Sequence, residues 1–72
     1  MHEREALVLG VTRDFFAQHG YAPTLMEIGA RANLSANTVA QYIARLEIRG
    51  FIKKGPRGHR NLQLVNKEPE AA

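Results

Sequence analysis

The sequence predicts a mainly α-helical domain, in which three helices are followed by a small β-hairpin. Apolar residues recur at helical spacing in three consecutive segments, each bounded by residues typical of helix ends. A short turn separates the second segment from the third, and beyond Gly50 the pattern changes to the alternation of a strand. Because the chain has 72 residues, one domain is expected. We place it at residues 1–65, with a polar tail or linker over residues 66–72.

The first helix is expected over residues 3–19. Val8, Val11 and Phe15 recur at i, i+3 and i+7, which is one face of a helix. Gly10 is a weak point, because glycine costs about 1 kcal/mol against alanine in a helix interior. The broad apolar arc of this helix indicates that it packs against two partners.

A second helix is expected over residues 24–32. Thr24 and Glu27 have the spacing of a capping box, in which each side chain accepts a hydrogen bond from the backbone N–H of the other residue. Ile28 belongs to the apolar stripe of this helix. Asn33 suits the left-handed conformation that ends a helix.

The third helix is expected over residues 36–49, with Ser35 as its N-cap and Gly50 at its end. Val39 and Ile43 belong to its apolar face, which goes to the core. Since a short turn joins the two short helices, they form a helix-turn-helix, whose second helix presents its N-terminal half outward.

Two strands are expected over residues 51–54 and 61–65, separated by a turn at residues 55–58 that contains glycine and proline. A basic hairpin directly after a helix-turn-helix is a wing, so the predicted architecture is a winged helix-turn-helix. The basic residues of the hairpin are Lys53, Lys54, Arg57, His59 and Arg60.

The charge of the chain is unevenly spread. Residues 31–67 contain eight Lys or Arg and a single acid, Glu47, which gives this segment a formal charge of +7. Residues 1–30 have a formal charge of −2. Such asymmetry indicates a polyanionic partner, and the alternative is a solvated basic face.

The N-terminal half of the third helix is polar but uncharged. In a helix-turn-helix bound to DNA, the second helix lies in the major groove and its first residues meet base edges. Asparagine and glutamine pair bidentately with adenine, and a threonine methyl contacts a thymine methyl. The candidate base-contacting residues are Ser35, Ala36, Asn37, Thr38 and Gln41. In the alternative, Ser35 and Thr38 only cap the helix and the two amides face solvent.

A second set of residues is expected to hold the DNA backbone. These residues are Thr24, Arg45, Arg49, Lys53, Lys54, Arg57, His59 and Arg60. Phosphate contacts of this kind position a protein on the duplex. Arg57 and Arg60 have a minor-groove alternative, because a narrow minor groove attracts arginine. Arg45 has two alternatives, a pair with Glu47 or a position on the solvent side.

Two stretches of the chain resemble a known family. EIGARANLSANTVAQYIARLEIRGFIKK, followed by PRGHRNLQL and preceded by GYAPTLMEIG, is similar to the N-terminal winged helix-turn-helix domain of LexA-type SOS repressors. The resemblance covers residues 4–65. One departure is the turn between Ala32 and Ser35, which is slightly shorter than expected for this family.

The resemblance implies a function in transcription. It implies a repressor of the bacterial or phage SOS response to DNA damage, in the cytoplasm at the nucleoid. Its partner would be double-stranded DNA with an inverted-repeat operator, bound by two copies side by side. The family's second domain, which carries the peptidase dyad and most of the dimer interface, has no counterpart in these 72 residues. No peptidase activity is therefore expected.

Other chemistry receives no support. The three histidines have no metal-ligand spacing, there is no cysteine, and no nucleophile–base–acid constellation is visible. We therefore expect no enzyme, metal or cofactor. No apolar run reaches the length of a membrane span. A second function stays open, in which the winged helix binds a protein, such as a full-length repressor or RNA polymerase, to modulate transcription.

Overall fold

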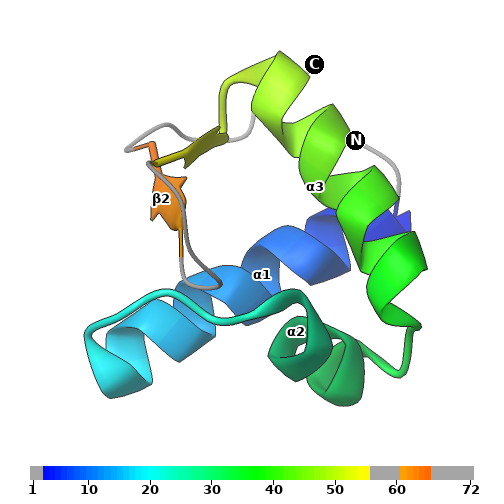
Figure 1. Ribbon diagram of the computed structural model, residues 1–72, viewed down its shortest axis with the longest axis horizontal. Helices are drawn as coiled ribbons and strands as arrows, with labels where there is room; N and C mark the ends of the chain where they lie inside the picture. The colour runs from blue at the N-terminus through cyan, green and yellow to red at the C-terminus, as the bar shows by residue number, and fades with distance from the viewer. Residues whose placement is uncertain (1–2, 56–60, 66–72) are drawn as a thin grey trace.

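The computed structural model describes residues 3–55 and 61–65. In this part of the chain, the elements in order are α1 (Glu3–His19), α2 (Leu25–Ala32), α3 (Ala36–Arg49), β1 (Ile52–Lys54) and β2 (Leu62–Leu64). Figure 1 shows α3 rising on the right and the hairpin at the upper left, with α1 and α2 in the lower part of the molecule. Helix α1 packs against α2 and α3, and β1 packs against α3. The predicted fold, mainly helical with a hairpin, is confirmed.

The predicted helix ends are confirmed by their caps. The N–H of Glu27 donates to the Thr24 hydroxyl at 3.1 Å, and the N–H of Thr24 donates to the Glu27 carboxylate at 2.8 Å. This reciprocal pair satisfies two backbone donors that the first turn of α2 would otherwise leave unpaired. Asn33 (φ 57°) and Gly50 (φ 87°) are both left-handed and end α2 and α3.

The hairpin strands are shorter than predicted. Ile52 pairs with Leu64 and Lys54 with Leu62 in an antiparallel register. Phe51, just after the left-handed Gly50, belongs to neither strand, and its side chain is buried in the core. Its carbonyl nevertheless accepts from the N–H of Val65 at 3.0 Å, so pairing continues past the strand ends. Most of the predicted turn at residues 55–58 lies outside the described residues.

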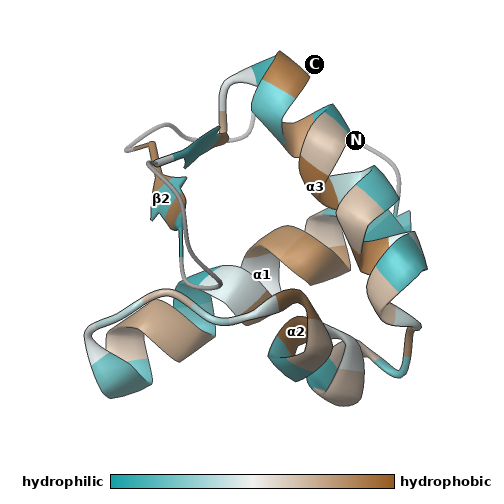
Figure 2. Cartoon of the chain, viewed as in Figure 1, coloured by the Kyte–Doolittle hydropathy of each residue, from teal (hydrophilic) through white to brown (hydrophobic). Residues whose placement is uncertain are grey.

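The core lies where the three helices and the hairpin meet. Its buried side chains are Val8, Leu9, Ala22, Ile28, Val39, Ile43, Leu46, Phe51, Ile52 and Leu62. Figure 2 shows hydrophobic segments on α1 and α2 where these two helices face each other, and further ones along α3. Every described element contributes at least one of these side chains, so the hairpin is held against α3 by the same core that holds the helices.

The buried face of α1 differs from the predicted one. Val8 and Phe15 are buried as expected, and Val11 is half-buried. Two polar residues, Glu5 and Thr12, complete the face instead. The Thr12 hydroxyl donates to the carbonyl of Val8 at 2.8 Å, which satisfies it within the helix.

Gly29 sets the turn between α2 and α3. Its carbonyl accepts from the N–H of Leu34 at 2.9 Å. A Cβ at position 29 would collide with the backbone carbonyl oxygen of Leu34. The turn therefore approaches α2 so closely that only glycine fits, and this approach fixes where α3 begins.

Candidate nucleic-acid interface

The N-terminus of α3 is capped by two hydroxyls. Ser35 is the N-cap, and its oxygen accepts from the N–H of Thr38 at 3.2 Å. The Ser35 hydroxyl donates in turn to the Thr38 oxygen at 2.9 Å. The capping role predicted for Ser35 is thus present in the structure. The pair orders the first turn of α3 and leaves the Thr38 hydroxyl hydrogen available to a partner.

One stripe of α3 faces outward along the whole helix. It consists of Asn37, Gln41, Ala44 and Ile48, all exposed and at helical spacing, opposite the buried Val39. This outward stripe contains no charged residue. At its N-terminal end the two amides offer donors and acceptors, and at its C-terminal end the Ile48 side chain is 86% exposed. Amides without net charge suit discrimination among base edges, which differ in their donors and acceptors.

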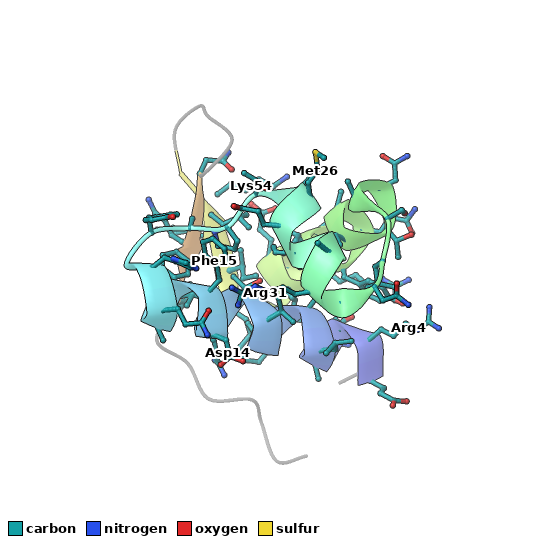
Figure 3. The ribbon with its side chains drawn as sticks, turned by 90° about the horizontal axis from the view of Figure 1, so that it is seen from below. Arg4, Asp14, Phe15, Met26, Arg31 and Lys54 are labelled. Atoms are coloured by element: carbon teal, nitrogen blue, oxygen red, sulfur yellow. The ribbon has the colours of Figure 1, made fainter. Side chains whose placement is uncertain are left out.

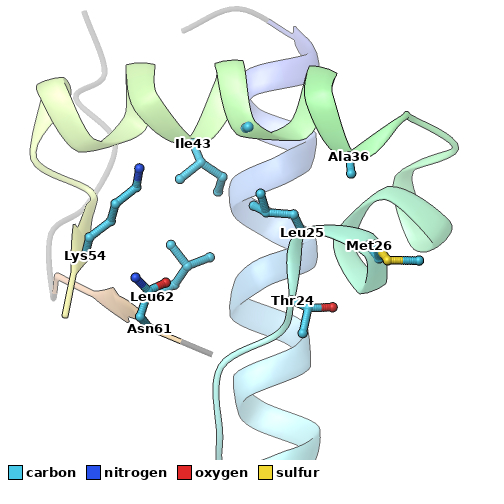
Figure 4. A pocket seen from close by; sticks show the side chains of 9 residues that line it. Thr24, Leu25, Met26, Ala36, Ile43, Lys54, Asn61 and Leu62 are labelled. Carbon is cyan, nitrogen blue, oxygen red and sulfur yellow. The ribbon is translucent and has the colours of Figure 1, made fainter. Parts of the chain in front are cut away.

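A groove runs beside this stripe, between the start of α2, one side of α3 and the hairpin. Its volume is about 500 Å³. Figure 4 shows Ile43 of α3 pointing toward Lys54 and Leu62 of the hairpin, with Leu25 beside them and Met26 pointing away. They are Thr24, Leu25, Met26, Ala36, Ala40, Ile43, Lys54, Asn61 and Leu62. We call this feature the strand-side groove of α3. The lining is mainly apolar, and Lys54 is its charged residue.

The two lysines of β1 lie on opposite faces of the hairpin. Lys54 pairs with Leu62, and both side chains line the groove. Lys53 pairs with Gln63, and both are exposed on the other face. Figure 3 shows Lys54 and Met26 on the side of the molecule away from Asp14 of α1. The sequence analysis assigned both lysines to the DNA-backbone contacts. Because side chains alternate along a strand, the structure places them on opposite faces of the hairpin.

The two predicted backbone arginines of α3 have partners within the protein. The Nε atom of Arg49 lies 2.8 Å from Oε2 of Glu5, as an ion pair without hydrogen-bond alignment. Glu5 is 1% exposed and the Arg49 side chain 52%. The guanidinium of Arg45 lies 5.6 Å from the ring centroid of Tyr42, which is a cation–π contact. Both arginines therefore lie on the α1 side of α3, across the helix from the groove.

Arg31, another member of the basic segment, packs away from α3. Its guanidinium lies 5.0 Å from the ring centroid of Phe15, which Figure 3 shows beside it. The same ring also contacts the His19 ring, which is tilted against it, and the Tyr21 ring edge-on just beyond the end of α1. This cluster joins α2 to the C-terminal end of α1. One positive charge of the basic segment 31–67, that of Arg31, therefore packs against an aromatic ring of the domain.

Three predicted wing residues, Arg57, His59 and Arg60, lie outside the described residues, as does the predicted tail at 66–72. In the described part of the chain, no group of three or more His, Cys, Asp or Glu side chains is placed to hold a metal ion. No helix among the described residues has the length and hydropathy needed to cross a membrane.

Comparison with known proteins places the fold in a family. The model of the LexA DNA binding domain matches residues 1–61. The chain belongs to the LexA DNA-binding domain family. The members of this family are DNA-binding domains, and the family is not an enzyme family.

Full-length members of the family are among the relatives. LexA repressor 1 of Nocardia farcinica is 43% identical over 53 residues, which are 72% of this chain and 24% of that protein. LexA repressor of Nocardioides sp. is 36% identical over 70 residues, 96% of this chain and 28% of the relative. LexA repressor of Leifsonia xyli is 30% identical over 73 aligned positions, 100% of this chain and 33% of the relative. The chain thus spans between a quarter and a third of the length of these relatives.

Of the residues that line the groove, the sequence analysis named only Thr24, Ala36 and Lys54 as site residues, and it missed the other six: Leu25, Met26, Ala40, Ile43, Asn61 and Leu62. A signal for Ala40 exists, because Ala36, Ala40 and Ile43 recur at helical spacing beside the apolar face. The signal is ambiguous, since small residues at this spacing are equally typical of close helix packing. Only the position of the hairpin shows that this side of α3 faces a groove.

Proposed function

We propose that this chain is the DNA-binding module of a LexA-like transcriptional repressor, and that it binds double-stranded DNA with sequence preference. The observation that carries the proposal is the N-terminal half of α3. It is capped by Ser35, follows a tight helix-turn-helix turn, and presents Asn37 and Gln41 outward. Membership of the LexA DNA-binding domain family supports the same conclusion.

In this proposal α3 lies in the major groove. Asn37 and Gln41 each pair with an adenine through two hydrogen bonds, and the Thr38 methyl packs on a thymine methyl. Ser35 and Ala36, at the very start of the helix, lie close enough to the bases to contact them or the adjoining phosphate. Because the outward stripe is uncharged, its affinity depends on which bases it meets.

The backbone contacts come from both sides of α3. Thr24 and Lys54 would contact phosphates on the groove side of α3. Lys53 would contact them from the outer face of the hairpin, and Arg45 from the α1 side of α3. Arg49 belongs to the same proposed set, and it would contact DNA while paired with Glu5. The wing residues Arg57, His59 and Arg60 complete the set on phosphates or in the minor groove.

The operator is proposed to be an inverted repeat. A single module of this size buries about 600–1,000 Å² on DNA, which gives weak binding. Two copies on two half-sites, or a protein partner, would supply the remaining affinity. The regulated genes would be those of the SOS response to DNA damage.

A second candidate function is binding to a protein. The exposed Ile48, 86% accessible at the C-terminal end of the outward stripe, favours it, because large apolar side chains are usual in protein interfaces. The partner would be a full-length repressor or RNA polymerase. Both functions can coexist, since Ile48 and Asn37 lie at opposite ends of the helix.

The test is selection of bound duplexes from a random library at about 0.15 M salt. We expect an enriched motif in the form of an inverted repeat, whose half-site spacing shows how two copies lie on the duplex. The matched control is the Asn37→Ala, Gln41→Ala double variant, which should enrich no motif while retaining the fold. A folded wild-type protein that enriches nothing would overturn sequence-specific binding and favour the protein partner.

A further inference from the structure

Ile48 is the most exposed large apolar side chain in the described part of the chain, at 86%. Neither core packing nor helix formation accounts for an isoleucine at this position. An exposed side chain adds no contacts to the core, and a β-branched residue forms helix less readily than alanine or leucine. A partner that covers the side chain accounts for it.

Ile48 borders a hollow on the α1 side of α3. The hollow has a volume of about 390 Å³ and is lined by Glu5, Arg45, Ile48 and Arg49. We call these four residues the Ile48 face. Glu5 is buried, and Arg49 balances its charge at 2.8 Å, so Arg45 gives the face a net positive charge. The Ile48 face therefore combines an exposed apolar side chain with a cation.

The charges in this half of α3 are divided between two flanks of the helix. Arg45 and Arg49 lie on the α1 flank, whereas the exposed Glu47 lies on the flank opposite Arg45. The Tyr42 ring lies 5.6 Å from the guanidinium of Arg45 and limits the directions that it can take. An acidic partner that approaches the Ile48 face thus meets the arginines, and it avoids the carboxylate of Glu47.

The position of the Ile48 face favours a protein over DNA as its occupant. Asn37 and Ile48 are eleven residues apart, which is about 16 Å along the helix axis. In a helix-turn-helix the first residues of the second helix meet the bases, so Ile48 lies far from that contact. A phosphate would match the arginines and leave Ile48 exposed, whereas a protein segment can cover Ile48 and pair with Arg45 together.

We propose that the Ile48 face binds an acidic segment of a protein partner, with an apolar side chain of the partner packed on Ile48 and a carboxylate paired with Arg45. The assignment rests on the second candidate function, protein binding, and adds the chemistry of the partner to it.

The experiment selects short peptides from a random displayed library on the folded wild-type chain. The most enriched peptide is synthesised and titrated against the wild type, Ile48→Gln and Arg45→Gln. As matched controls, Leu7→Gln replaces a half-exposed leucine of α1, and Arg31→Gln removes a positive charge that lies over Phe15, away from the Ile48 face. Circular dichroism and thermal unfolding establish that each variant is folded.

We expect the enriched peptides to carry Asp or Glu beside a large apolar residue. Ile48→Gln should weaken peptide binding by at least about tenfold, because the burial of an isoleucine is lost. Arg45→Gln should weaken it by about fivefold at about 0.05 M salt and by less at about 0.5 M, since salt screens an exposed ion pair. Leu7→Gln and Arg31→Gln should bind the peptide as the wild type does.

Several results would contradict the proposal. Enrichment of peptides without acidic residues, or no enrichment, would show that the charge of the face selects no partner. Equal affinity of the wild type and Ile48→Gln would place the peptide elsewhere on the protein. A loss in Leu7→Gln as large as that in Ile48→Gln would indicate non-specific apolar association.

The selection of DNA duplexes is a separate measurement on the wild-type chain and involves no peptide. A failure of the peptide experiment would therefore overturn the Ile48 face and leave sequence-specific DNA binding standing. Peptide binding that depends on Ile48, in a chain that enriches no duplex, would support the face and overturn DNA binding.

Discussion

The two halves of α3 share one helix and one buried face, but their polar side chains do different things. In the N-terminal half, Asn37 and Gln41 are exposed on the outward stripe. In the C-terminal half, Arg45 lies over Tyr42 and Arg49 is paired with the buried Glu5. The first of these contacts lies within α3, and the second joins the C-terminal half of α3 to α1 through an ion pair. The N-terminal half instead offers its polar groups to a partner. A helix anchored at one end and available at the other can carry a binding surface in a fixed orientation.

The shared buried face sets the largest expected effect. Ile43 is 1% exposed and lies beneath both halves, so Ile43→Ala should lower the free energy of unfolding by roughly 2–4 kcal/mol. Urea denaturation followed by circular dichroism measures it. For so small a domain this is a large part of the total stability. A variant as stable as the wild type would mean that the face assigned to the core is wrong.

The exposed amides of the N-terminal half should affect binding and not folding. Asn37→Ala or Gln41→Ala should each weaken binding to the enriched duplex by about 1–3 kcal/mol and relax specificity at one base pair. Both residues are exposed, so the unfolding free energy should change by no more than about 0.5 kcal/mol. Titrations with matched and random duplexes measure the first effect. An equal loss of affinity for the matched and the random duplex would show that the substituted residue does not contact a base.

The ion pair of the C-terminal half should affect folding more than binding. Glu5→Gln removes the charge that Arg49 faces and should lower the unfolding free energy by about 1 kcal/mol, since a half-exposed arginine regains water. Glu3→Gln, an exposed glutamate in the same first turn, is the matched control and should change little. If the two variants proved equally stable, the Glu5–Arg49 ion pair would not stabilise the domain. The proposed difference between the two halves of α3 would then be wrong.

The smallest expected effect lies outside α3. Gly10→Ala should raise the unfolding free energy by about 0.5–1 kcal/mol, because a Cβ there meets no neighbour and alanine favours the helix. Gly29→Ala makes the same change where the Cβ strikes the Leu34 carbonyl, so it should destabilise the domain. Thermal unfolding distinguishes the two. Destabilisation by Gly10→Ala would contradict this prediction and indicate that a Cβ at position 10 collides with another part of the protein.

The parts of the fold that were predicted from the sequence follow local rules. The Thr24–Glu27 capping box, the Ser35 cap and the left-handed Asn33 and Gly50 all depend on residues within one turn of one another. Their spacing is visible in the sequence, and the predicted ends of α2 and α3 agree with the structure. The hairpin was predicted from alternation, and its strands are shorter than predicted at Phe51, Asn61 and Val65.

The parts that were missed depend on contacts between distant segments. Glu5 reads as an ordinary acidic residue of a first helical turn, and only the packing of α1 on α3 brings it to Arg49. The division of Lys53 from Lys54 needs the register of the strands and the side of α3 on which they pack. Of the predicted contact residues, Asn37 and Gln41 lie as expected on an exposed face, and their contacts with DNA remain a prediction.

The most direct test of the central claim is an NMR titration of the isotope-labelled chain with the enriched duplex. The account predicts that the largest shifts occur in the side-chain amides of Asn37 and Gln41 and in the backbone around Ser35, with smaller shifts at Lys54 on the groove side. Arg49, a proposed phosphate contact, should shift less than Asn37 and Gln41, and Glu5 of α1 should shift least. Shifts concentrated at Ile48 and Arg49, with Asn37 and Gln41 unchanged, would contradict the account and show that the anchored half of α3 is the binding half.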